Sequence, residues 1–170
     1  SLARVVDNLV VLCTRKGSKG SQERFDMGAE ARIRIERERR RAERNSVEVK
    51  LKTSGSLEID GDREAVMLAL GNLVENAVFW SPAGEQVKVD LNGENEGLEI
   101  TVDDSGPGVP EAEREKIFEA FFQGVAKSRE HRIGYGLGLA LTQDAVSAHG
   151  GRVWVEESPG GGARFRVCPP

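Results

Sequence analysis

Residues 98–110 read Leu-Glu-Ile-Thr-Val-Asp-Asp-Ser-Gly-Pro-Gly-Val-Pro. Leu98, Ile100 and Val102 alternate with polar residues, which is typical of a strand with one buried face. The same alternation places Asp104 on the buried face, where the glycines that follow end the strand. Burying a carboxylate is costly unless hydrogen-bond donors meet it. The stretch therefore predicts either an acid at the floor of a ligand pocket or a strand that ends in an Asx turn.

The composition is that of one domain. The 170 residues are 38% hydrophobic and carry a net charge of -4, which is enough apolar material for one core of α+β type. The acidic excess argues against a dedicated nucleic-acid binder, because too few basic residues remain to neutralise phosphates over a large surface. Cys13 and Cys168 have no metal-ligand spacing, so we expect two incidental thiols in a reducing compartment.

Residues 1–14 place apolar side chains at helical spacing, without a start signal before them. This pattern favours the end of a longer helix, and the polar, glycine-rich residues 15–21 favour a hinge or linker after it. The longest apolar run, Leu9 to Cys13, is far too short to span a bilayer, and no cleavable signal precedes it. We therefore expect these 170 residues to be soluble and to make no contact with a membrane.

Hydrophobic periodicity also predicts the remaining elements. Helices are predicted over residues 29–44, 62–80, 111–118 and 137–149. Strands are predicted over residues 47–51, 57–60, 86–92, 97–103, 152–156 and 163–167, with a hairpin turn at Gly93. Phe121 and Phe122 follow the short helix and are expected to form a hydrophobic anchor.

Two asparagines stand one turn apart on the helix over residues 62–80. Asn72 and Asn76, with Glu75 beside them, lower helix propensity but present amide oxygens from a rigid element. Hard cations such as Mg²⁺ take oxygen ligands of this kind, one or two from protein and the rest from phosphates and water. The alternative is a structural role, in which buried asparagines bind loop backbone.

The glycines of Gly134-Tyr-Gly-Leu-Gly138 lead directly into the helix over residues 137–149. Glycines at a helix start expose backbone N–H groups at the positive end of the helix dipole, where phosphates bind. The basic segment before them, residues 123–133, has no clear period and is expected to be mobile. The chain contains no Gly-x4-Gly-Lys-Ser/Thr motif, which excludes a P-loop, and no strand precedes the glycines as a dinucleotide fingerprint requires.

Taken in order, four stretches resemble the N, G1, F and G2 boxes of the ATP-binding domain of two-component sensor histidine kinases. They are Asn72-Leu-Val-Glu-Asn76, Asp104-Ser-Gly-Pro-Gly108, Phe118-Glu-Ala-Phe-Phe122 and Gly134-Tyr-Gly-Leu-Gly138. The resemblance covers about residues 25 to 168. It implies an α+β fold of Bergerat type, shared with gyrase-type ATPases: a two-layer α/β sandwich whose mixed, mostly antiparallel sheet packs against helices.

The resemblance also implies a division of the chain. Residues 1–14 look like the end of the second helix of a dimerisation and phosphoacceptor domain, residues 15–24 like a linker, and residues 25–170 like the catalytic ATP-binding domain. The domain would transfer the γ-phosphoryl group of ATP to a histidine on a dimerisation domain that is absent from this chain. Further partners would be a second copy of the parent protein and the receiver domain of a response regulator. The parent would work in the cytoplasm, either free or anchored in a bacterial inner membrane.

The cofactors implied are ATP and Mg²⁺. Asp104 would accept a hydrogen bond from the adenine amine, and Asn76 would ligate the metal. A lid from Gln123 to Tyr135 would close over the phosphates, and Arg132 or Lys127 would offset charge on the transferred group. The implied nucleotide contacts are Asn72, Asn76, Trp80, Asp104, Gly106, Gly108, Lys127, Arg132, Gly134, Tyr135, Gly136, Leu137 and Gly138. Trp80 would lie near the adenine or serve the core alone.

The chain departs from the family pattern at two positions. Phe79 stands where the family usually has a lysine or arginine, and Tyr135 replaces a small or hydroxyl residue. Glu75 matches the position of a general base in related ATPases and joins Asn76 and Arg132 as a catalytic candidate. Two alternatives therefore remain: a degenerate nucleotide-sensing or docking module, which Phe79 favours, and a serine kinase of the anti-sigma type.

The chain shows no acceptor histidine of the family type. His131 falls in the expected lid, and His149 falls at a helix C-terminus, where a capping role is expected. We therefore expect this chain to bind Mg-ATP without autophosphorylation.

Overall fold

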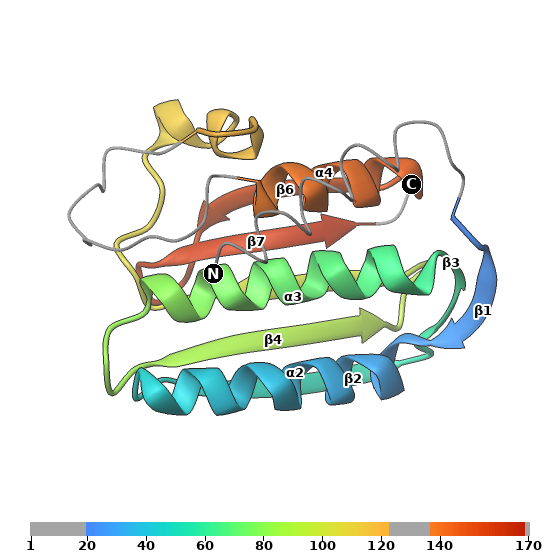
Figure 1. The fold of residues 1–170 in the computed structure, drawn as a ribbon, viewed down its shortest axis with the longest axis horizontal. Helices are drawn as coiled ribbons and strands as arrows, with labels where there is room; N and C mark the ends of the chain where they lie inside the picture. Colours follow the sequence, from blue (N-terminus) through green and yellow to red (C-terminus); the bar gives the residue numbers. More distant parts are fainter. Residues whose placement is uncertain (1–19, 123–136, 169–170) are drawn as a thin grey trace.

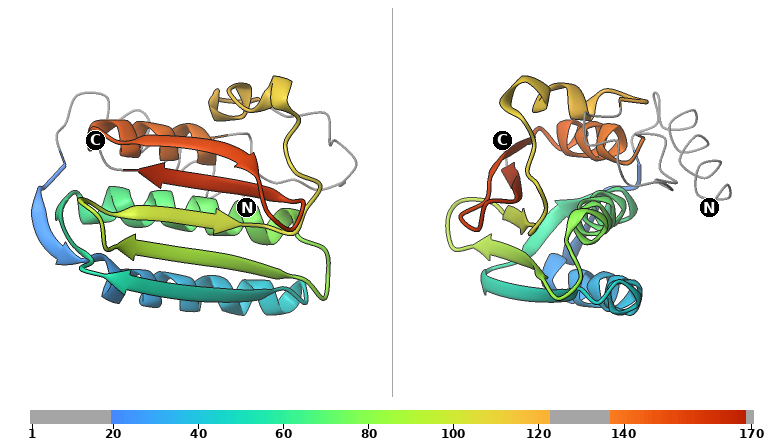
Figure 2. Two further views of the ribbon diagram at one scale, coloured as in Figure 1. Left: turned by 180° about the vertical axis from the view of Figure 1, so that it is seen from behind. Right: turned by 90° about the vertical axis from the view of Figure 1, so that its left-hand side faces the viewer.

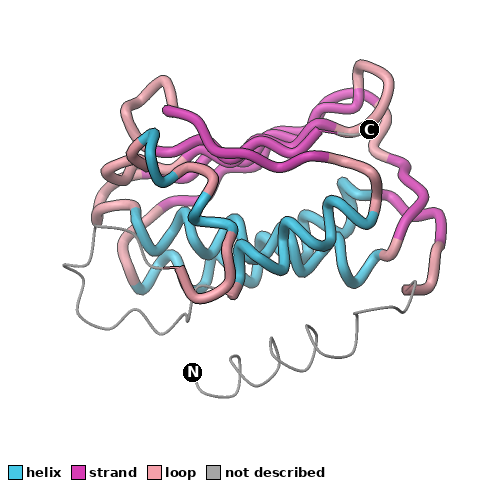
Figure 3. The backbone as a smooth tube through the Cα atoms, turned by 90° about the horizontal axis from the view of Figure 1, so that it is seen from above, coloured by secondary structure: helices cyan, strands magenta, loops and turns pink. Residues whose placement is uncertain are grey.

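Three helices cover one face of a five-stranded sheet in the computed structural model, which describes residues 20–122 and 137–168 (Figure 1, Figure 3). Seen from behind, the sheet lies in front and the helices lie beyond it (Figure 2). The helices are α2 (Met27–Arg44), α3 (Arg63–Trp80) and α4 (Gly138–Ala148). This arrangement confirms the predicted two-layer α/β sandwich. None of the helices in the described ranges is both long and apolar enough to cross a membrane.

The strands of the large sheet lie in the order β2-β4-β5-β7-β6. The first pair is parallel and the other three pairs are antiparallel, so the sheet is mixed and mostly antiparallel, as predicted. The strands are β2 (Glu48–Gly55), β4 (Gln86–Gly93), β5 (Glu99–Asp103), β6 (Arg152–Glu157) and β7 (Ala163–Cys168). The predicted hairpin at Gly93 joins β4 to β5.

The core lies between the sheet and the helices. Val87, Val89 and Leu91 alternate along β4 and are at most 1% exposed, which confirms the predicted period of two. They meet a helix layer whose buried apolar residues include Ile35 and Ala42 of α2, Leu70, Leu73, Val74 and Ala77 of α3, and Leu139 of α4. The helices pack against the sheet because each carries one apolar stripe.

A second, two-stranded sheet pairs β1 (Glu23–Asp26) with β3 (Glu58–Gly61). The first of these strands, which includes the last two residues of the predicted linker, was not expected. Only Phe25 of the four residues is buried, so the strand is too short to show a hydrophobic period. Asp26 at its end caps α2 by accepting hydrogen bonds from the first-turn N–H groups, and α2 begins two residues earlier than predicted for this reason.

The predicted helix over residues 111–118 is wrong in type. The structure has two single turns of 3₁₀ helix, η1 (Glu111–Glu113) and η2 (Lys116–Phe118). No side chain caps the start of either turn, so an α-helix there has no partner for its first N–H groups.

The predicted hydrophobic anchor is also partly wrong. Phe121 is 63% exposed and has a left-handed backbone with φ of 66°. Phe118 is the buried aromatic of this segment, and its ring meets Phe165 of β7 edge-on with 6.2 Å between centroids. The segment is thus anchored to the core through its 3₁₀ turn.

Two polar contacts hold α3 and α4 side by side. The side-chain amide of Asn72 donates to the carbonyl of Gly138 at 3.1 Å, and Nε2 of His149 accepts from the backbone N–H of Asp62 at 3.0 Å. Because Nε2 accepts, Nδ1 carries the proton and donates to the carbonyl of Ala145 at 2.7 Å. The start of α4 lies beside the middle of α3 and its end beside the start of α3, so the two helices run antiparallel. His149 is the C-cap of α4, as expected.

Candidate functional site

Asp104 lies at the end of β5 and is 5% exposed. Its Oδ1 accepts from the backbone N–H groups of Gly106 and Ala163, each at 2.9 Å. The bond from Gly106 is an Asx turn, so the structure contains both the buried carboxylate and the turn that the sequence left open. Burial raises the pKa of the Asp104 carboxyl above its ordinary value, and the two backbone donors offset only part of that effect.

The backbone around Asp104 is too close for side chains. A Cβ at Gly106 would lie 2.8 Å from the carbonyl oxygen of Trp80, and one at Gly162 would lie 2.6 Å from Oδ1 of Asp104. Gly108 has a φ of 77°, which side chains rarely adopt. Glycines from two distant loops therefore let the backbone pack closely against the carboxylate.

Two serines that the sequence analysis missed fix the turn after Asp104. Ser81 ends α3, is 3% exposed, and its Oγ accepts from the backbone N–H of Ser105 at 3.1 Å. The same hydroxyl donates to the carbonyl of Ala77 at 2.8 Å, and Ser105 donates to the carbonyl of Gln86 at 2.8 Å. The Ser81 hydroxyl thus ties the end of α3 to the turn, and the Ser105 hydroxyl ties the turn to the start of β4. A serine followed by proline at a helix end is the signal that would have pointed to Ser81.

The side chains of Asn72 and Asn76 differ in their burial, although the two residues are one turn apart on α3. Asn72 is 5% exposed, and its side-chain amide donates to the carbonyl of Gly138. This is the structural role that the sequence left open as an alternative to metal binding. Asn76 is half-buried. Asn72 thus positions the start of α4.

The start of α4 has the features of a phosphate site. Its N-cap, Leu137, is buried and supplies no side-chain hydrogen bond to the first turn. The first-turn N–H groups of such a helix point outward at the positive end of the dipole, where an anion can satisfy them. Gly138, the first helical residue, lies against Asn72. The start of α4 and Asn72 are therefore brought together by the fold.

The side chain of Glu75 points toward α2. Its Oε1 is 3.1 Å from Nη1 of Arg41 on α2, and its side chain is 28% exposed. The structure therefore places this catalytic candidate on the α2 side of α3, whereas Asn72 contacts α4.

Trp80 is half-buried at the end of α3, and its backbone and Cβ lie against Gly106. Its ring is edge-on to that of Phe79, with 5.1 Å between centroids. Trp80 thus lies beside the turn that follows Asp104. The remaining predicted contacts, Lys127, Arg132, Gly134, Tyr135 and Gly136, lie outside the described residues.

The donor set fits Mg²⁺ held through phosphates better than a metal held by protein alone. Among residues 20–122 and 137–168, no group of three or more His, Cys, Asp or Glu side chains could hold an ion. Mg²⁺ in nucleotide sites needs only one or two protein oxygens. Asn76 is the residue from which the sequence predicts such an oxygen.

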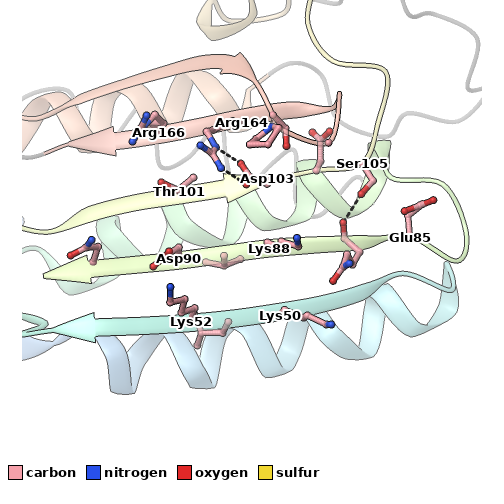
Figure 4. Close-up of a pocket in the computed structure, with 18 of the residues that line it drawn as sticks. Lys50, Lys52, Glu85, Lys88, Asp90, Thr101, Asp103, Ser105, Arg164 and Arg166 are labelled. Atoms are coloured by element: carbon pink, nitrogen blue, oxygen red, sulfur yellow. Dashed lines mark hydrogen bonds and ion pairs between the residues drawn. The ribbon is translucent and has the colours of Figure 1, made fainter. Parts of the chain in front are cut away.

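A hollow of about 970 Å³ lies on the outer face of the sheet, and its lining includes Asp104 and Ser105 (Figure 4). Asp103, the neighbour of Asp104, points to this face and forms two bonds with Arg164, at 2.6 and 2.7 Å. Arg166 binds Glu99 at 2.6 Å and Glu156 at 3.0 Å. The acids on β5 are thus neutralised within the sheet, which is usual for the solvated face of an antiparallel sheet.

Four features in the described residues agree with the ATP-binding domain that the sequence resembles: a buried acid at a strand end, the glycines around it, the asparagines on α3, and a start of α4 to which the N-cap Leu137 gives no side-chain hydrogen bond. Residues 61–170 match the sequence model of the family described as "Histidine kinase-, DNA gyrase B-, and HSP90-like ATPase", and the chain belongs to this family. Within it, the chain is a catalytic ATP-binding domain of the sensor histidine kinase type.

Named relatives support this placement. The signal transduction histidine-protein kinase/phosphatase MprB of Mycobacterium sp. (strain KMS) is 37% identical over 174 residues, which cover 99% of this chain and 33% of that protein. The sensor-like histidine kinase SenX3 of Mycobacterium tuberculosis (strain ATCC 25618 / H37Rv) is 30% identical over 99% of this chain and 42% of that protein. The chain therefore spans about a third to two fifths of the length of these relatives.

A solved structure shares the fold over most of the chain. The mycobacterial sensor histidine kinase MprB superposes with a TM-score of 0.76 at 32% identity, covering 88% of this chain and 97% of that one. The structure confirms the fold class and the family that the sequence predicted.

Proposed function

We propose that this domain binds Mg-ATP between α3, the turn after Asp104 and the start of α4, and transfers the γ-phosphoryl group to a histidine on a separate dimerisation and phosphoacceptor domain. The observation that carries the proposal is the buried Asp104 carboxylate. Both of its hydrogen bonds from described residues go to Oδ1, and burial keeps its pKa raised. The adenine amine would bring the further N–H donor that such a carboxylate needs.

Each element has one task in this proposal. Asp104 selects adenine, and the glycines beside it let the ring approach the backbone. The first N–H groups of α4 hold phosphates, and the amide oxygen of Asn76 ligates Mg²⁺. The metal supplies charge that offsets the phosphates. Asn72 acts on the site through Gly138.

The proposal extends to segments outside the described residues. Lys127 and Arg132 neutralise charge on the transferred group, and Tyr135 and its flanking glycines belong to a lid over the phosphates. The parent protein is a homodimer that passes the phosphoryl group to a receiver domain, and this domain works in the cytoplasm. The relatives named above, which extend beyond the length of this chain, support a parent with further domains.

The test is calorimetric titration of the chain with ATP, with and without Mg²⁺. Asp104→Asn keeps an Oδ1 acceptor for Gly106 and Ala163 but replaces the carboxylate oxygen that faces the ligand with an amide donor. Losing a charged hydrogen bond costs about 1.5–3 kcal/mol, or roughly 10- to 150-fold in affinity. Asn76→Ala is expected to abolish the dependence of ATP binding on Mg²⁺.

Asp103→Asn is the matched control, because it makes the same change one residue earlier on the opposite face of the sheet. It should leave the affinity for ATP as in the parent. If Asp103→Asn weakens binding as much as Asp104→Asn does, the adenine site is not where we place it. Mixing the chain with the separately produced phosphoacceptor domain and Mg-ATP should then yield phosphohistidine on that domain, and none on this chain.

A further inference from the structure

The outward face of α2 carries a row of exposed residues that is mainly basic. The row, which we call the α2 stripe, consists of Ile33, Arg37, Arg40 and Arg44. Steps of four, three and four residues place these side chains along one face of a helix. The residues that α2 buries lie on the opposite face: Met27, Gly28, Ala31, Ile35, Glu38 and Ala42. The stripe therefore points away from the domain, and Ile33 within it is 57% exposed.

The arginines of the stripe differ from those at its borders, which are bound to the rest of the domain. On one side, Arg39 donates to the backbone carbonyl of Val49 on β2 at 3.0 Å. On the other side, Arg41 lies 3.1 Å from Glu75 on α3. Among residues 20–122 and 137–168, the three guanidinium groups of the stripe form neither an ion pair nor a hydrogen bond. The border arginines thus hold the domain together, whereas the stripe serves no contact within it.

The charges of the stripe destabilise the free helix. Arg37 and Arg40 are three residues apart, and Arg40 and Arg44 are four apart, so each neighbouring pair repels. Only Arg44, in the last turn, is favoured by the helix dipole. The whole chain has a net charge of -4, so the stripe is not part of a general basic excess. An anionic partner on the stripe would relieve the repulsion.

Two exposed carboxylates beside the stripe decide which kind of anionic partner fits it. Glu36 and Glu43 lie along its β2 side, and Glu36 is 3.1 Å from Arg39. A broad anionic surface, such as a bilayer or a nucleic-acid backbone, would meet these carboxylates together with the arginines, and Ile33 alone offers little apolar surface to lipid. A helix is narrow enough to follow the row, which is about 16 Å long, and acids at the same three- and four-residue steps would match its arginines.

We propose that the α2 stripe is a docking surface for an acidic helix of a separate protein. Carboxylates of that helix pair with the three arginines, whose planar guanidinium groups suit carboxylates, and an apolar side chain packs on Ile33. Exposed charges around a single apolar contact give a salt-sensitive, rapidly reversible complex, which is typical of a transient partner. No residue of the stripe belongs to the proposed nucleotide site, so the inference is independent of that function.

The probe is a fluorescent, alanine-rich helical peptide that carries one leucine and three glutamates at the steps of the stripe, made in both chain directions. An isomer of the same composition, with its glutamates spread around the helix, is the control peptide. At low ionic strength, fluorescence anisotropy should show that the chain binds one of the row peptides at least about fivefold more tightly than the isomer, and screening in about 0.5 M salt should remove most of this difference.

Variants of the chain locate the contact. The triple variant Arg37→Gln, Arg40→Gln, Arg44→Gln should bind the row peptide roughly 3- to 150-fold more weakly, because one exposed ion pair contributes roughly 1.4- to 5-fold. Arg32→Gln is the matched control: it removes an exposed arginine from the same helix but outside the stripe, and it should bind as the parent does. Ile33→Ser should weaken binding by a few fold.

Equal binding of the row peptides and the isomer would overturn the inference, as would equal losses in the triple variant and in Arg32→Gln. Anionic phosphatidylglycerol vesicles and duplex DNA are titrated in parallel. If either binds the parent more tightly than the row peptides do, and the triple variant loses that binding, the partner is not an acidic helix and the inference is wrong. If circular dichroism shows that the triple variant does not fold, Arg40→Gln decides alone, and unchanged binding of the row peptide by that variant overturns the inference.

Discussion

Gly162 lies where the β6–β7 hairpin meets Asp104, and we predict that an alanine there both destabilises the domain and damages the adenine site. A Cβ at this position would meet the backbone carbonyl of Asp104 and lie 2.6 Å from its Oδ1. Backbone atoms cannot rotate away as a side chain can, so the hairpin itself has to move. The next residue, Ala163, donates to Oδ1 and accepts from the backbone N–H of Asp104, each at 2.9 Å.

The size of the effect follows from these contacts. Overpacking of a rigid site costs about 1–3 kcal/mol, and weakening the bond from Ala163 to a buried carboxylate adds about 1–2 kcal/mol. The expected loss is thus roughly 2–5 kcal/mol in the free energy of unfolding. For a domain of this length that lowers the thermal midpoint by about 5–15 °C.

Gly160→Ala is the matched control in the same turn. A Cβ at Gly160 would meet nothing within 4 Å, so its free energy of unfolding should stay within about 0.5 kcal/mol of the parent value. Urea and thermal unfolding of both variants, followed by circular dichroism, measure the difference. Equal stabilities of Gly160→Ala and Gly162→Ala would refute the reasoning, as would a Gly162→Ala protein that binds ATP as tightly as the parent.

Three further results are expected. Ser81→Ala leaves the backbone N–H of Ser105 without its partner and should lower the free energy of unfolding by about 1–3 kcal/mol in urea. His149→Phe removes the acceptor of the Asp62 N–H and should cost a similar amount, and nitrogen chemical shifts of the parent should show His149 protonated on Nδ1. The pKa of the Asp104 carboxyl is raised in the folded domain. Ionisation of this carboxyl should therefore destabilise the ligand-free domain as the pH rises from the ordinary pKa of an aspartate through the raised pKa of Asp104. Asp104→Asn should therefore be the more stable protein at pH 7, and its advantage should disappear as pH falls below about 4.

The sequence predicted those features that depend on local periodicity. The alternation around Ile100 and Val102 identified β5 and placed Asp104 on the inner face, and the apolar stripe of α3 gave its bounds to within one residue. Patterns of this kind are readable because burial repeats every two residues in a strand and every 3.6 in a helix. The order of the four sequence boxes then predicted the family.

The remaining features depend on contacts between distant segments. Nothing near Glu75 in the sequence indicates that Arg41, 34 positions earlier, would pair with it, and nothing near Asp104 points to Ala163. The strand β1 was missed because a four-residue strand with one buried side chain has no period to detect. Such features arise only when packing brings the elements together.

The place of β7 in the sheet has a consequence for the biosynthesis of this domain. It is the last strand of the described chain, yet it lies between β5 and β6, and Ala163 at its start completes the hydrogen bonds of Asp104. A chain still attached to the ribosome therefore has an unfinished adenine site until β7 has left the exit tunnel. If the domain binds ATP at this site, as we propose, only a chain that contains β7 can bind it, and ATP would stabilise the finished domain and not its nascent fragments.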